Sequence, residues 1–180
     1  MRKVIWILTA TSAIALLSAA AAQAAPASPA HHGPATVLNF DTMAPVTGPY
    51  VGTANPVRGI AGGGLPWILK SATGSLKRNG HVLVVVRGLV LAKQSPVPPA
   101  LQGTNPIPDF RAIVSCQSIG AGNTATVVNV STGNFKASKA GNAKIDARVK
   151  LPRPCIAPIV FVTAPAGNDV WFAATGANGR

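Results

Sequence analysis

The residues able to perform acid–base or nucleophilic catalysis are few in this chain. It has no Glu, and its acids and histidines are Asp41, Asp109, Asp146, Asp169, His31, His32 and His81. A serine hydrolase requires a serine, a histidine and an acid in one constellation, and the G-x-S-x-G motif that often carries the serine is absent. A glycosidase requires a pair of carboxyls, and the sequence shows no such pairing. The chain is therefore predicted not to be an enzyme. The alternative is a secreted hydrolase that uses His81 and Asp109, if the fold brings them together.

Metal and nucleotide sites are not indicated either. His31 and His32 are adjacent on a segment rich in Ala, Pro and Ser, and two ligands on a flexible tether are too few for a defined zinc site. The glycine-rich block at 59–67 is similar in composition to a phosphate-binding loop. Such a loop needs Gly directly before its Lys, however, and here Leu69 precedes Lys70. We predict no cofactor and no metal, and we interpret the glycines as a tight loop that lets the backbone pass close to Trp67.

The N-terminus has the three parts of a secretory signal peptide in order. Arg2 and Lys3 are followed by an apolar stretch at 4–17 and by a small-x-small cleavage site at 22–24. The alternative is a membrane anchor, but the apolar stretch is shorter than the roughly 20 residues that span a bilayer. We therefore predict a cleaved signal peptide at 1–24 and a secreted, extracellular protein. No second apolar segment follows, so no transmembrane segment is expected in the mature chain.

Two cysteines remain after this cleavage. In an exported chain an even number of cysteines favours a disulfide, so Cys116 and Cys155 are predicted to be bonded to each other. In the chain-entropy model, closing a loop of this length stabilises the fold by about 4 kcal/mol. The composition at 25–35 cannot pack and is typical of a flexible lead-in, which leaves 36–180 as a single domain.

The charge of the mature chain is strongly positive. It carries 14 Lys and Arg against four Asp, a net charge of +10, which favours association with polyanions. Strand alternation over 143–151 places Lys144, Arg148 and Lys150 on one side as a linear cationic stripe. An anionic cell-surface polymer or polysaccharide is the partner that this stripe would contact. The alternative is that the charge only keeps an exported protein soluble.

Strand patterns recur along the chain, and helical patterns do not. The expected strands are at 36–40, 67–76, 81–91, 110–116, 124–130, 143–151, 159–163 and 170–175. Asn79-Gly80 predicts a type I′ hairpin turn, and apolar residues on both faces of 81–91 indicate a central strand. Seven or eight short strands predict an all-β fold, a two-layer antiparallel β-sandwich; a small β-barrel is the alternative.

A long loop is predicted at 93–109, because five prolines interrupt it. Loops presented by rigid scaffolds often bind or catalyse. The hydrolase alternative would place its site near this loop, and a third hypothesis is a secreted protease inhibitor that presents the loop as bait.

Three blocks of the sequence are similar to one known group of proteins. The blocks are GGGLPW at 62–67, FRAIVSC at 110–116 and LPRPCIAPIVFV at 151–162. Together they resemble a family of small exported bacterial proteins of unassigned function. The resemblance implies an exported bacterial protein with one domain, and it supplies no catalytic residue. The leading hypothesis is thus an exported, non-enzymatic binding or surface-associated β-domain with a basic face.

Overall fold

The computed structural model describes residues 33–165 and 169–176. The predicted signal peptide at 1–24, most of the lead-in at 25–35 and the histidine pair lie outside the described residues. Within the described ranges, no helix is long and apolar enough to cross a membrane. The structure therefore covers most of the domain predicted at 36–180.

One antiparallel sheet, sheet A, has four strands. In spatial order they are β1 (Thr36–Phe40), β4 (Ser71–Lys77), β5 (His81–Arg87) and β10 (Ala143–Arg148). The strand β1 has the predicted bounds, and β5 lies between β4 and β10 as expected for a central strand. The buried side of the sheet carries Leu76, Val82, Val84, Val86 and Ile145, each at most 1% exposed.

The second sheet, sheet B, is also antiparallel. Its strands in spatial order are β2 (Ala44–Pro45), β12 (Trp171–Ala174), β11 (Ile156–Thr163), β7 (Asp109–Ile119) and β8 (Ala125–Ser131), and β9 (Phe135–Lys136) also pairs with β7. A short 3-10 turn, η3 (Ala121–Asn123), joins β7 to β8. The core side of the sheet carries Phe110, Ala112, Val114, Val160 and Val162, all fully buried.

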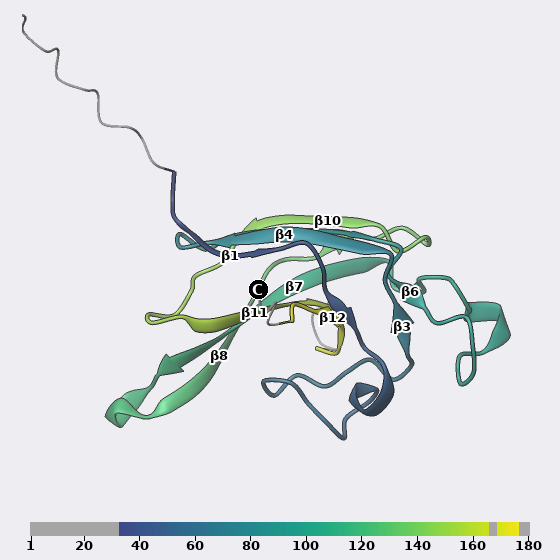
Figure 1. Cartoon of the computed structure of the whole chain (residues 1–180), viewed down its shortest axis with the longest axis horizontal. Helices are drawn as coiled ribbons and strands as arrows, with labels where there is room; N and C mark the ends of the chain where they lie inside the picture. Colours follow the sequence, from purple (N-terminus) through teal and green to yellow (C-terminus); the bar gives the residue numbers. More distant parts are fainter. Residues whose placement is uncertain (1–32, 166–168, 177–180) are drawn as a thin grey trace, which may run out of the picture. The chain divides into compact units, whose positions relative to one another are not determined.

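The two sheets pack face to face around these apolar side chains. Figure 1 shows β1, β4 and β10 in one layer and β7, β11 and β12 in the other. The described strands do not close into a barrel, because each sheet has two edge strands. The predicted all-β sandwich is therefore confirmed.

The turn between β4 and β5 differs from the prediction. The Gly80 N–H donates a 2.9 Å hydrogen bond to the Lys77 carbonyl, and Gly80 has a φ of +83°. Asn79 does not have a positive φ, so the type I′ turn was wrong. The loop has three residues and ends on a left-handed glycine, which is a common hairpin geometry. A Cβ on Gly80 would overlap the Val149 carbonyl oxygen.

Two predicted strands are each divided in the structure. The segment 67–76 becomes β3 (Trp67–Ile68) and β4, and 81–91 becomes β5 and β6 (Val90–Leu91). The strands β3 and β6 pair with each other in a separate two-stranded sheet. The break falls at the same level in both arms, where the Lys70 N–H donates to the Arg87 carbonyl and Gly88 has a φ of +65°. Gly88 thus lets the hairpin turn a corner out of sheet A.

Residues 46–66, which we call the cover segment, run along the β12 edge and over the outer face of sheet B, where the Tyr50 and Trp171 ring centroids are 6.3 Å apart and Arg58 donates to the Ala157 carbonyl. The segment contains the 3-10 turn η1 (Gly48–Tyr50), and its Gly63 N–H donates to the Trp171 carbonyl at 2.9 Å. The Cβ position of Gly63 lies 3.2 Å from Trp67 Nε1, which confirms that glycine lets the backbone pass close to this indole. Because of this cover, Ile113 and Phe161 on the outer face are as buried as the core side.

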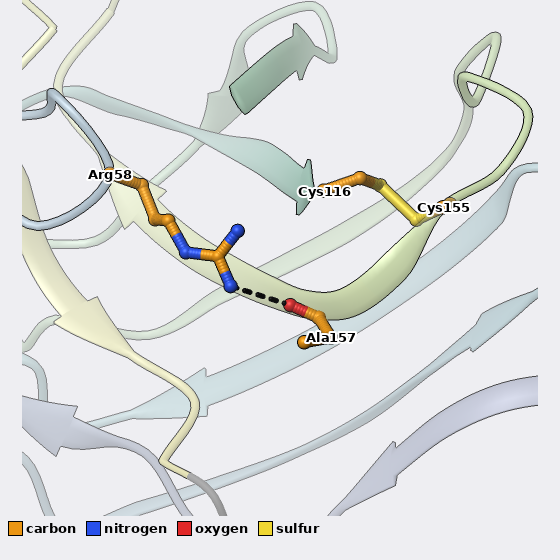
Figure 2. The surroundings of a disulfide bond; sticks show 4 residues. All are labelled: Arg58, Cys116, Cys155 and Ala157. Carbon is orange, nitrogen blue, oxygen red and sulfur yellow. Dashed lines mark hydrogen bonds between the residues drawn. A yellow bond between two sulfur atoms is a disulfide. The ribbon is translucent and has the colours of Figure 1, made fainter. Parts of the chain in front are cut away.

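The disulfide is present as predicted. Cys116 Sγ and Cys155 Sγ are 2.02 Å apart, and neither cysteine is free. Cys116 lies on β7 and is fully buried, whereas Cys155 directly precedes β11 and is partly exposed. Since β7 and β11 are neighbours, the bond ties two adjacent strands of sheet B near Arg58, which reaches the Ala157 carbonyl (Figure 2).

Candidate functional site

The outer face of sheet A carries a group of basic side chains. Because β5 and β10 alternate, Arg87 at the end of β5 and Lys144 and Arg148 on β10 project from the side opposite the core. All three residues are exposed. The register places Lys144 beside Val85 and Arg148 beside His81, so the cations are spread along the sheet and across two strands.

Only two of the three residues of the predicted stripe lie on a strand. Lys144 and Arg148 lie on β10, but the strand ends at Arg148, so Lys150 is exposed in the loop that follows. Arg87 was not in the predicted stripe, because a stripe on one strand says nothing about which residues of the neighbouring strand share its face. The signal that could have identified Arg87 is its alternation with the buried Val86.

Asp146 is the acid within this cationic row. Its carboxylate accepts a 2.8 Å hydrogen bond from His81 Nε2 and lies 3.3 Å from Lys144 Nζ. The hydrogen bond with His81, and then that with Lys144, lowers the pKa of Asp146 below its usual value. Lys144 is therefore partly neutralised, whereas Arg87 and Arg148 have no ionic partner in the described part of the chain.

A shallow basic groove lies at the Arg87 end of this face. It has a volume of about 300 Å³, and its basic lining residues are Arg87, Lys136 and Lys144. Lys136 Nζ is 3.1 Å from Asp109 Oδ1, but the lysine side chain is 90% exposed and Asp109 is only 22% exposed. Three basic residues therefore border a groove whose lining residues include no carboxylate.

A second hollow lies beside the proline-rich loop. This groove of about 540 Å³ is lined by the apolar residues Val51, Trp67 and Ile68, and by the segment 92–96. The loop contains the 3-10 turn η2 (Pro99–Leu101) and is held to β6, since the Gly103 N–H donates to the Leu91 carbonyl at 3.0 Å. Among the residues lining the groove, Lys93 is the one with an ionisable side chain. The lining could hold an apolar molecule, but it offers no acid–base pair.

The residues of the hydrolase alternative are each engaged elsewhere. The structure pairs His81 with Asp146 and Asp109 with Lys136, and no hydrogen bond or ion pair joins His81 to Asp109. The His81–Asp146 pair lies on the open outer face of sheet A, and neither residue lines either of the two grooves. In the described residues, no group of three or more His, Cys, Asp and Glu could hold a metal ion.

Arg111 is the basic residue whose environment the sequence did not reveal. It lies on β7, on the face opposite the core, and is 7% exposed. Burial lowers the pKa of Arg111, and its guanidinium forms an ion pair with Asp169, which precedes β12. This cation is structural and is not available to a partner.

Comparison of the chain with protein-family models, with curated proteins and with solved structures gave no match. The resemblance to small exported bacterial proteins therefore stays a prediction.

Proposed function

We propose that the protein is an exported, non-enzymatic binding module that holds an anionic polymer on the outer face of sheet A. The observation that supports this most directly is the row of Arg87, Lys144 and Arg148 on one exposed sheet face, where Asp146 is the opposing charge. Cations on a rigid sheet keep fixed spacings, which suits a repeating polyanion such as a wall polymer or an acidic polysaccharide.

Two physical arguments favour the sheet face over charge dispersed across the surface. The unpaired arginines stand near opposite ends of β5, which at about 3.4 Å per residue places them roughly 20 Å apart. A polymer can span that distance, whereas a small anion cannot. The groove beside Arg87 adds Lys136 to the same end of the face.

The test is retention on an immobilised polyanion, such as dextran sulfate, over a series of salt concentrations. Each neutralised charge releases counterions, so Arg87→Gln combined with Arg148→Gln should elute at lower salt and flatten the salt dependence by about one to two charges. Lys93→Gln with Arg153→Gln removes the same charge from exposed positions outside this face and serves as the matched control. Equal elution of the two double variants would exclude the face and leave the net charge as a solubility feature.

Lys150 is tested separately, because it lies beyond the end of β10. A Lys150→Gln variant that elutes with the wild type would restrict the binding surface to the strands. A variant that elutes as early as the arginine double variant would extend it to the loop.

A further inference from the structure

The strand β8 is a free sheet edge without the usual protection. It pairs with β7 on one side, in a regular register from Ala125 to Ser131, and within the described residues nothing pairs with its other side. Natural proteins blunt such edges with charges, prolines, bulges or short strands, because an open edge accepts another strand.

The other sheet edges each carry one of these devices. The edge strand β10 bears Lys144, Asp146 and Arg148, β1 has an irregular register after Thr36, and β2 is two residues long and contains Pro45. By contrast, β8 has seven residues, ATVVNVS, with neither charge nor proline.

The whole hairpin around β8 is uncharged. Residues 117–134 contain no Lys, Arg, Asp or Glu, although the chain carries a net charge of +12. Two copies of so basic a protein repel each other across most of their surfaces. The hairpin itself brings no like charges to such an approach, and Arg58, whose carbonyl accepts a hydrogen bond from the Asn129 side chain of β8, has its guanidinium on the Ala157 carbonyl of β11. An anionic partner would instead be drawn to the basic residues.

An exposed apolar patch adjoins the free edge. Ile119, Val127 and Ile156 are 51%, 45% and 52% exposed. The register makes them neighbours, because Val127 and Ile156 both lie opposite Gln117, and Ile119 follows two residues later on the same face. Figure 1 shows the β8 end of this hairpin extending away from the strands of sheet A.

We propose that β8 is a self-association edge, at which two copies pair their β8 strands antiparallel across a two-fold axis. A strand paired with its own copy meets the symmetry requirement of an isologous dimer. With the axis near Val128, Thr126 would face Val130 of the second copy, and such β-branched cross-strand pairs are stabilising. The two B sheets would then form one continuous sheet. This inference does not depend on the proposed polyanion binding.

The test measures mass in solution by sedimentation equilibrium over a wide range of protein concentration. The wild type should form dimers, and dimerisation should strengthen with added salt because salt screens the like charges. That trend is opposite to the one expected for polyanion binding. Val127→Lys should raise the dimer dissociation constant at least tenfold, since it brings new like charges close together at the edge. Ile68→Lys makes the same charge change at an isoleucine that is 39% exposed and lies on β3, and it should leave the dimer unchanged.

A protein that stays monomeric at all concentrations would overturn the inference, as would equal weakening by both variants. Hydrogen exchange of the wild-type protein provides a second test, which does not depend on whether a variant folds. The amides of Ala125–Ser131 should gain protection with increasing concentration, and those of β10 should not. Exchange of β8 that is independent of concentration, or protection gained at another edge, would also refute the pairing.

Discussion

Breaking the Cys116–Cys155 bond is expected to lower the stability of the domain substantially without rearranging its core. The bond closes a sequence separation of 39 residues. In the chain-entropy model, closing a loop of this length lowers the entropy of the unfolded chain and so stabilises the folded state by about 4 kcal/mol. Losing the bond then corresponds to a fall in Tm of about 10–15 °C for a domain of this size. The native packing should persist, since reduction leaves both side chains in place.

The assay compares thermal unfolding of oxidised and reduced protein by circular dichroism, with thiol titration of the native state. The oxidised protein should have no reactive thiol. Cys155→Ala is the informative variant, because this partly exposed position loses little packing and the thiol of Cys116 stays in the core. Its Tm should match that of the reduced wild type and should not respond to reductant. Coincident melting of oxidised and reduced wild type would refute the reasoning.

Three further predictions concern stability. Gly80→Ala should destabilise by at least about 2 kcal/mol in urea titrations, because it combines a left-handed φ with a backbone overlap, whereas Gly64→Ala, where nothing lies near the Cβ position, should be close to neutral. Asp169→Ala should lower the free energy of unfolding by about 1–2 kcal/mol, a value reduced for the 55% exposure of the aspartate. Arg111→Met should lower it less, because only Asp169→Ala leaves a buried guanidinium unpaired. The folded state lowers the pKa of Asp146, so the ionised carboxylate stabilises the fold above the unfolded pKa of about 4, and this stabilisation is lost as the pH falls further. The Tm of Asp146→Asn should therefore be lower than that of the wild type at pH 7 and equal to it in strong acid.

Local patterns in the sequence predicted the parts of the fold that local chemistry determines. The alternation of Ala143 and Ile145 with charged residues identified β10 and its exposed face, and Phe110 to Cys116 identified the strand that buries the disulfide. Neither needs information from a distant segment, because a period of two residues already separates the faces of a strand.

The features that were missed depend on contacts between distant segments. The corner between β5 and β6 is set by Gly88 against Lys70, and only the glycine within a valine-rich run could have indicated it. Arg111 is buried and paired with Asp169, which is 58 residues away in the sequence, and nothing local distinguishes it from an exposed arginine on the same alternation. The exact membership of the basic face likewise depends on which strands are neighbours.

The order of the strands has a consequence for how the chain can fold as it is synthesised. Sheet A takes β1, β4 and β5 from the first half of the described chain but β10 from the second, and sheet B takes β2 from the first half and its remaining strands from the second. A nascent chain that ends before β7 therefore holds three strands of sheet A whose apolar side, with Leu76 and Val84, has no opposing sheet. Pairings this distant in sequence form slowly, because the loops between them must close first. Sheet A cannot be completed until β10 has been synthesised, and sheet B cannot be completed until β12 has been synthesised. A fragment that ends before β7 can therefore form neither native sheet.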